Sequence, residues 1–156
     1  MTQTVPTTQT TNPFTEGGDA GIRDGGPGAP HRPADRFEAG WRALARIDGE
    51  VGEKVVAALA GIAPDFGRLL VEFPFGDIYT RPGLDLRARE IATIAALCAL
   101  GNAGPQLKVH IEAGLNVGLA REEIVEILMQ MAVYAGFPAA LNGLFAAKEV
   151  FAARDA

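Results

Sequence analysis

Reactive side chains are scarce in this sequence, which has one cysteine and two histidines among its 156 residues. A single cysteine, Cys98, excludes an internal disulfide, a CxxC redox pair and a zinc site made from several cysteines. Cys98 lies in the middle of an apolar run, whereas a reactive thiolate needs a helix N-terminus or a nearby cation. We therefore expect Cys98 to behave as a small, buried apolar residue.

Positive charge and long apolar runs are scarce as well. The formal net charge of −5 argues against nucleic acid as a partner, because duplex binding requires clustered lysine and arginine. No stretch reaches the ~18 consecutive apolar residues of a membrane-spanning helix, so we expect no membrane partner. The opening residues, MTQTVPTTQTTNPF, lack the basic start and apolar centre of a secretory signal. These features predict a cytoplasmic protein.

The first part of the chain differs in composition from the rest. Residues 1–34 are rich in Thr, Gln, Gly and Pro, and a run such as GGDAGIRDGGPGAPHRP cannot bury enough apolar surface to offset the entropy of ordering. We expect a disordered N-terminal tail over residues 1–34, which includes His31, followed by one helical domain over residues 35–156. Because 48% of the chain is hydrophobic, this domain can build a substantial core.

Helical periodicity continues through nearly all of residues 35–156, and no run alternates in the manner of a β-strand. Several residues mark where helices begin and end. Asp85 is suited to cap one helix and Pro105 to start the next, while Gly118 and Gly136 are suited to end helices.

Pro64 is expected to open a further helix, followed by an ordered connection over residues 75–83. The stretches around 86–101 and 121–135 are the most apolar, which favours an antiparallel pair of core helices. The pattern therefore predicts a compact all-α domain of about six helices.

Glu90 and His110 are the two best candidates for acid–base chemistry. Glu90 shares a helix face with Ile94 and Leu97, so its carboxylate should face inward and needs either a partner or a raised pKa. His110 lies at the edge of an apolar face, and its ordinary pKa makes it the best proton donor or acceptor near neutral pH. Residue pattern alone leaves a second interpretation open for each: a structural ion pair for Glu90, and a packed core histidine for His110.

Three other polar side chains are candidates for binding a substrate. Arg81 follows Tyr79 closely and precedes a Pro-Gly turn, and its planar guanidinium is suited to a carboxylate. The alternative for Arg81 is a surface ion pair with Asp77 or Asp85. Tyr134 could contribute a hydroxyl group to a pocket.

Four segments, taken together, are more specific than any of these residues alone. Their order is the same as in one known family, and the similarity extends without large gaps from about residue 36 to residue 153. The segments are RFEAGW (36–41), FGDIYTRPGLDLRARE (75–90), LGNAGPQLKVHIEAGLNVGLAREEIVEIL (100–128) and YAGFPAALNGL (134–144). They resemble the carboxymuconolactone decarboxylase family, which belongs to the alkylhydroperoxidase D-like superfamily.

The resemblance implies an all-helical fold of the alkylhydroperoxidase D-like type that assembles into a trimer or a hexamer. The redox-active branch of this superfamily carries a glutamate, a CxxC pair and a downstream histidine. Glu90 and His110 are similar to that glutamate and histidine, but no cysteine precedes His110 in GPQLKV, and Cys98 lies too far upstream. The resemblance therefore implies the non-redox branch.

The same resemblance implies a cofactor-independent and metal-independent reaction. It removes CO2 from 4-carboxymuconolactone to give 3-oxoadipate enol-lactone, in the breakdown of aromatic acids through protocatechuate (the β-ketoadipate pathway). In this interpretation His110 donates a proton, and Glu90 orients His110 or keeps it protonated. Either His110 or a backbone N–H could stabilise the charge that develops on the lactone oxygen. Arg81 binds substrate carboxylate, and Tyr79 and Tyr134 complete the substrate site.

Three alternatives remain open. The chain could be a family member that acts on a different enolisable lactone or keto acid in another pathway. It could be a thiol-dependent peroxidase, which would require a reactive Cys98. It could also be a helical oligomer without catalytic activity, in which the polar residues are structural.

Overall fold

The computed structural model describes residues 33–156, with side chains from residue 36 onward. The predicted tail, including His31, lies outside the described residues, except that the first helix begins two residues before the expected boundary. Within the described range the chain forms seven α-helices and one π-helical segment and no strand, which confirms the all-α prediction. The elements are α1 (Pro33–Ile47), α2 (Gly49–Leu59), α3 (Pro64–Leu70), η1 (Val71–Ile78), α4 (Leu86–Leu100), α5 (Gly104–Asn116), α6 (Arg121–Tyr134) and α7 (Phe137–Arg154).

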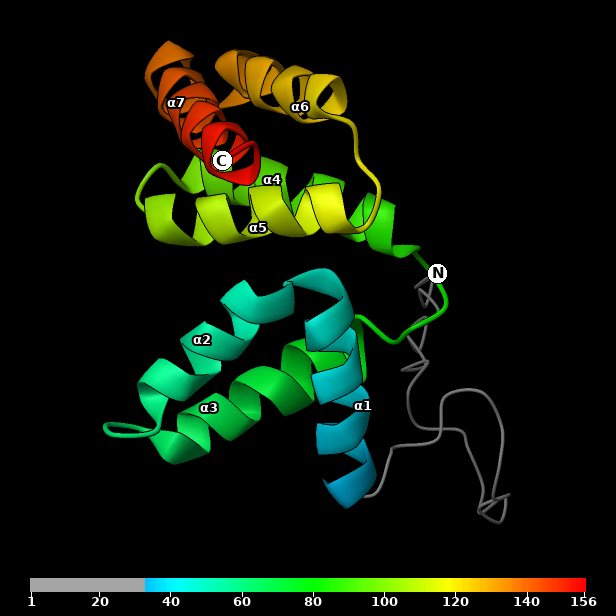
Figure 1. Cartoon of the computed structure of the whole chain (residues 1–156). Helices are drawn as coiled ribbons and strands as arrows, with labels where there is room; N and C mark the ends of the chain where they lie inside the picture. The colour runs from blue at the N-terminus through cyan, green and yellow to red at the C-terminus, as the bar shows by residue number, and fades with distance from the viewer. Residues whose placement is uncertain (1–32) are drawn as a thin grey trace, which may run out of the picture.

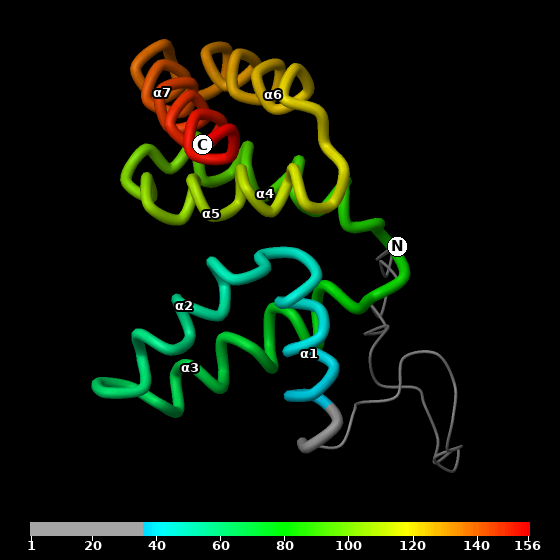
Figure 2. Tube along the Cα trace, in the orientation of Figure 1, coloured from blue at the N-terminus to red at the C-terminus, as the bar shows by residue number. Residues whose placement is uncertain are grey.

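The helices are arranged in two groups (Figure 1). The first group contains α1, α2, and α3 with its continuation η1, and the second contains α4 to α7. The tube view shows α5 on the side of the second group that faces α2 (Figure 2), and both of these helices contribute to one cavity. No helix within residues 33–156 is both long and apolar enough to cross a membrane.

Each group has its own apolar core. The first core joins α1 and η1 to α5 through the buried residues Leu44, Ile47, Val71, Phe75 and Ala113. The second core fills the space between α4, α5, α6 and α7, and it includes Cys98, which is 2% exposed. The prediction that Cys98 is a buried apolar residue is therefore confirmed. Because both cores include residues of α5, this helix links the two groups.

The helix ends follow the local sequence signals. Asp85 caps α4, because its Oδ1 accepts a hydrogen bond of 2.7 Å from the backbone N–H of Ala88. Gly101, Gly118 and Gly136 all adopt positive φ angles (72°, 94° and 86°), a conformation that glycine reaches without steric cost. The predicted cap at Asp85 and the predicted stops at Gly118 and Gly136 are confirmed.

The segment after α3 differs from the prediction. Residues 75–78 were expected to lie in a connection, but they continue the helix as η1. Pro74 has no N–H to donate, so a regular α-helical hydrogen bond is lost there. The chain widens into π-helical turns instead, in which the N–H of Tyr79 donates to the carbonyl of Pro74 over 2.8 Å. The connection to α4 therefore starts only after Ile78.

Helices α1 and η1 cross at very short range because glycines lie at the crossing. A Cβ atom at Gly40 would be 2.2 Å from the carbonyl oxygen of Val71, and one at Gly76 would be 2.7 Å from the carbonyl oxygen of Arg36. Arg36 also donates two hydrogen bonds to Asp77, from Nε to Oδ1 over 3.0 Å and from Nη2 to Oδ2 over 2.5 Å. This crossing holds η1, and hence Tyr79 beyond it, in place.

Gly40→Ala should destabilise the protein by roughly 1–3 kcal/mol or more, as expected for overpacking against rigid atoms. The added Cβ meets backbone rather than a flexible side chain, so α1 and η1 must move apart. Chemical denaturation at pH 7 measures the change in the free energy of unfolding.

Gly61→Ala is the matched control, because nothing lies within 4 Å of a Cβ at that position. Its free energy of unfolding should stay within about 0.5 kcal/mol of the wild type. Equal effects of the two substitutions would contradict the importance of the α1–η1 crossing.

Candidate active site

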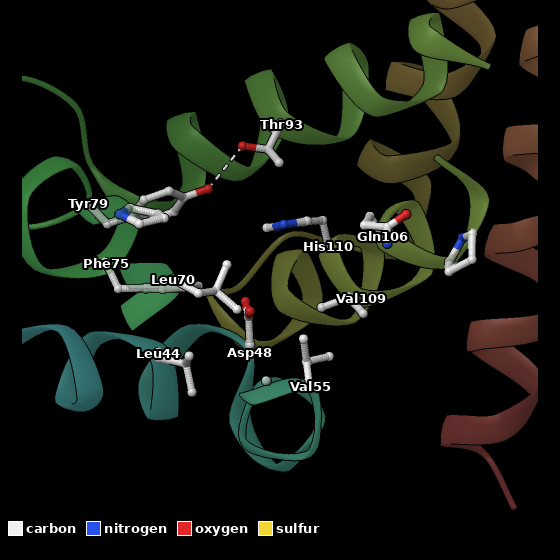
Figure 3. A pocket seen from close by; sticks show the side chains of 13 residues that line it. Leu44, Asp48, Val55, Leu70, Phe75, Tyr79, Thr93, Gln106, Val109 and His110 are labelled. Carbon is white, nitrogen blue, oxygen red and sulfur yellow. Dashed lines mark hydrogen bonds between the residues drawn. The ribbon is translucent and has the colours of Figure 1, made fainter. Parts of the chain in front are cut away.

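A cavity of about 350 Å³ lies between the two groups of helices. This volume suits a small organic molecule. Residues from both groups line it (Figure 3), so neither group forms the site alone. The lining residues are Leu44, Asp48, Gly52, Val55, Leu70, Pro74, Phe75, Tyr79, Thr93, Pro105, Gln106, Val109 and His110.

Glu90 and His110 form a hydrogen-bonded pair beside this cavity. The Oε2 atom of Glu90 lies 2.9 Å from Nδ1 of His110, which joins α4 to α5. Glu90 is 0% exposed, whereas the side chain of His110 retains 20% exposure, and its ring points into the cavity (Figure 3). The pair therefore has a buried half and a half that a ligand can reach. Proximity of these two residues was beyond what helical periodicity could predict.

The hydrogen bond determines how His110 can act. Burial alone would lower the pKa of His110, but the hydrogen bond from its ring to Glu90 and the charges of Glu90 and Asp48 outweigh burial and raise it. Because Nδ1 is engaged by Glu90, the other nitrogen, Nε2, is the one that can donate to a ligand. The arrangement supplies an oriented imidazole N–H and favours the protonated form of the ring.

Tyr79 and Thr93 form a second polar pair on the cavity wall. The hydroxyl of Thr93 donates to the carbonyl of Arg89 over 2.9 Å, which uses its single proton. The Tyr79 hydroxyl, 3.0 Å from Thr93 Oγ1, can therefore donate to that oxygen, and the carboxylate of Glu90 is a second acceptor for the same proton. Burial, together with nearby Glu90, raises the pKa of Tyr79, so the phenol stays neutral. Tyr79 therefore offers a ligand a neutral phenol hydroxyl on the cavity wall.

Asp48 is a cavity residue that the sequence analysis missed. It lies between α1 and α2, is only 6% exposed, and its Oδ1 has no hydrogen-bond partner among the described residues. Burial raises its pKa to about 6, with Glu90 adding to the rise and His110 opposing it. The Asp48-Gly49 dipeptide is a turn signal, but nothing in the sequence pattern indicates that the carboxyl group is buried.

The remaining predicted site residues lie outside the cavity lining. Arg81 is exposed, and its backbone carbonyl accepts a 3.0 Å hydrogen bond from Arg89. Tyr134 is 77% exposed at the end of α6. Their roles in substrate binding stay predictions. The Cys98 thiol donates to the carbonyl of Ala139 over 3.4 Å, and burial raises its pKa, which disfavours the reactive thiolate.

The cavity is largely apolar with a few acid–base groups. Its described lining includes no lysine or arginine, so His110 is the lining group that can carry a positive charge near neutral pH. Among residues 33–156, no three His, Cys, Asp or Glu side chains gather in a way that could hold a metal ion. The chemistry that these residues can perform is proton transfer and hydrogen bonding to a developing anion.

Glu90→Gln should lower the pKa of His110, because the strongest group that holds the imidazolium proton is lost while burial remains. The pKa is measured by following the imidazole proton resonances against pH in a His31→Gln background, where His110 is the one histidine left. Glu112→Gln, which changes a carboxylate elsewhere on α5, is the control and should leave the pKa unchanged.

The raised pKa of His110 also determines how the Glu90–His110 pair contributes to the stability of the fold as the pH changes. A raised pKa means that the folded protein binds the His110 proton more tightly than the unfolded chain does. The pair therefore stabilises the fold fully below the unfolded pKa near 6.5, and this contribution is lost as the pH rises through the raised value. An unchanged pKa in Glu90→Gln would show that the Glu90–His110 bond does not hold the proton.

Comparison with known proteins places this chain in a family. Residues 64–149 match the model of the carboxymuconolactone decarboxylase family. The chain is 37% identical over 117 residues to 4-carboxymuconolactone decarboxylase of Acinetobacter baylyi, an alignment that covers 74% of this chain and 87% of that protein. It is 33% identical over 99 residues to an uncharacterised 15.0 kDa protein of Paracoccus denitrificans (63% and 74% covered). It is also 30% identical over 76 residues to nitrosuccinic acid decarboxylase of Metarhizium robertsii (49% and 52% covered).

The family model and the first of these relatives each match more than half of the chain. The described residues are all-helical and bring Glu90 and His110 together, which agrees with these matches. This chain belongs to the carboxymuconolactone decarboxylase family.

Proposed function

We propose that this protein is a decarboxylase that converts 4-carboxymuconolactone into 3-oxoadipate enol-lactone without a cofactor, in aromatic-acid breakdown through protocatechuate. The observation that carries the proposal is the buried Glu90–His110 pair, whose imidazole ring points into a cavity of about 350 Å³. Membership of the family and two relatives that are named decarboxylases support this kind of enzyme.

The proposed reaction needs a hydrogen-bond donor where negative charge develops. When CO2 leaves, its bonding electron pair moves through the ring alkene of the lactone and onto the carbonyl oxygen, which gives a dienolate. The imidazolium N–H of His110 is suited to hold this oxygen, because Glu90 favours the protonated form of the ring and fixes its direction. His110 could also return a proton to the ring carbon, as a general acid does.

The apolar part of the cavity supports loss of a carboxylate. Val55, Leu70 and Phe75 line it and offer no hydrogen bonds from their side chains. A carboxylate beside such a wall is poorly solvated, whereas the CO2 that forms from it is neutral. Transfer of charge from the carboxylate to an oxygen near His110 therefore moves the charge from a poor environment to a better one.

A second candidate function is decarboxylation of a different acid. The observation that favours it is the absence of lysine and arginine from the described cavity lining, although 4-carboxymuconolactone carries two carboxylates. One relative is named for nitrosuccinic acid, in which a nitro group takes the place of the carbonyl as the electron acceptor. The Glu90–His110 pair could donate a hydrogen bond or a proton to the anion that forms in either reaction.

We also propose that the protein self-associates into a trimer or a hexamer. Four large and strongly exposed apolar side chains support this proposal, three at the junction of α6 and α7 and one further along α7. These are Val133 (78% exposed), Tyr134 (77%), Phe137 (74%) and Phe145 (59%).

His110→Gln should reduce turnover of 4-carboxymuconolactone by roughly 10²–10⁴-fold, the usual contribution of a general acid. Turnover is measured as CO2 release together with formation of the enol-lactone. His31→Gln, which removes the other histidine, is the control and should retain full activity.

The wild-type result separates the two candidate functions. Fast turnover that is lost in His110→Gln supports the lactone as substrate. A folded wild-type protein that releases no CO2 from this lactone rejects that substrate and directs the search to other acids with an electron acceptor next to the carboxylate.

The double substitution Val133→Glu/Phe137→Glu should shift the protein to smaller assemblies, because it places two charges in the exposed apolar surface. Sedimentation velocity measures the change. Ile62→Glu alters an exposed apolar residue between α2 and α3 and is the control, which should leave the assembly unchanged. A wild type that sediments as a monomer would contradict the proposal.

A further inference from the structure

Asp48 is a buried acid whose role the Glu90–His110 pair does not explain. It lies on the cavity wall but comes from the turn between α1 and α2, whereas Glu90 and His110 come from α4 and α5. Its Oδ1 is buried without a hydrogen-bond partner among the described residues, at 6% exposure of the whole residue. Such a group is costly to the fold, so its position calls for a chemical explanation.

The fold holds Asp48 in this position from three sides. Gly49 follows it with a φ of 58°, which permits the sharp turn between the two helices. Gly52 leaves room for it, since a Cβ there would be 2.5 Å from the Cβ of Asp48. Asn116 of α5 donates a 3.0 Å hydrogen bond to the carbonyl of Ile47, which ties the turn to the helix that carries His110.

Asp48 and His110 face the same cavity from different sides (Figure 3). The ionisable groups that act on Asp48 are His110 of α5 and Glu90 of α4, and Tyr79 lies on the same cavity wall. Burial raises the pKa of Asp48 to about 6, so a fraction of the free protein carries the protonated carboxyl group near neutral pH. An anionic substrate in the cavity favours the protonated form further, because like charges repel.

The proposed reaction requires two donors rather than one. The dienolate needs a hydrogen bond to its oxygen for as long as it exists, and it then needs a proton on a ring carbon. If His110 gives its proton to the carbon, it can no longer hold the oxygen as a cation. A second acid on another side of the cavity removes this conflict.

We propose that Asp48 is the catalytic acid that protonates the ring carbon after CO2 has left, while His110 remains hydrogen-bonded to the lactone oxygen. This inference rests on the proposed function. It assigns the two donor tasks to different residues: the oxygen to His110, supported by Glu90, and the carbon to Asp48.

The bond between the ring carbon and the carboxylate breaks, CO2 departs, and the electron pair passes through the ring alkene to the carbonyl oxygen. The carbonyl then re-forms, and the ring carbon next to it takes the proton from the Asp48 carboxyl group. Asp48 is left as a carboxylate and regains a proton from water, so one proton is consumed for each CO2 released.

The test is turnover in D2O with wild type and Asp48→Asn. Wild type should place one deuterium on a single face of the new ring methylene, which NMR of the product resolves. Asparagine matches aspartic acid in shape but has no acidic proton, so Asp48→Asn should lose roughly 10²-fold or more in kcat. The dienolate should then be protonated by solvent, with deuterium on both faces.

Two controls accompany this test. Asp65→Asn removes the same charge from an exposed position in α3 and should keep both the rate and the single-face labelling. Thermal melting shows that Asp48→Asn folds. Its Tm should exceed that of wild type at pH 8, because the buried charge is gone, and should match it below about pH 4, where Asp48 is protonated in both folded and unfolded chains.

The outcomes are distinct. A wild type that releases no CO2 overturns the proposed function and this inference with it. An active wild type whose Asp48→Asn variant keeps its rate and its labelling overturns this inference alone. A slow variant that still labels one face also overturns it, because Asp48 would then only shape the cavity. A slow variant that labels both faces supports Asp48 as the acid.

Discussion

The burial of Glu90 is the constraint on which the rest of the site depends. Its side chain has no exposed surface, and a carboxylate removed from water must be paired or lose its charge. His110 is the partner, and the 2.9 Å hydrogen bond between them joins α4 to α5 beside the cavity. The same bond sets which imidazole nitrogen is free. A requirement of the helix packing therefore also orients the group that a substrate would meet.

The cavity combines apolar walls with the carboxyl group of Asp48 and the imidazole of His110, and Glu90 lies beside it. Glu90 is hydrogen-bonded to the imidazole through Oε2, although its Oε1, like Oδ1 of Asp48, has no hydrogen-bond partner among the described residues. Asp48 destabilises the fold when it is charged. Since its pKa rises to about 6, its contribution to stability is largest at low pH and is lost as the pH rises through that value. Functional sites commonly retain groups that cost stability in this way. In this protein the residue that lowers stability is Asp48, which lines the same cavity as His110.

Local rules account for most of the fold and fail where the constraint is not local. The cap at Asp85 and the glycine stops operate within one helical turn, so the residues around them suffice to predict them. Local rules do not predict the continuation of α3 through Pro74, because proline usually interrupts a helix. What sustains this segment is its packing on α1, where Gly40 allows the two backbones to meet. That packing joins parts of the chain that no short pattern connects.

For the site, the sequence by itself determined which residues carry the chemistry and that Glu90 faces inward, because Ile94 shares its helix face and is buried as well. Only the tertiary structure decided that His110, 20 residues further on, is its partner. Periodicity describes one helix at a time and not how two helices are rotated against each other. The same holds for Asp48, whose turn was readable from Gly49. Its burial opposite His110 depends on how α2 packs against α5, which is a property of the folded chain.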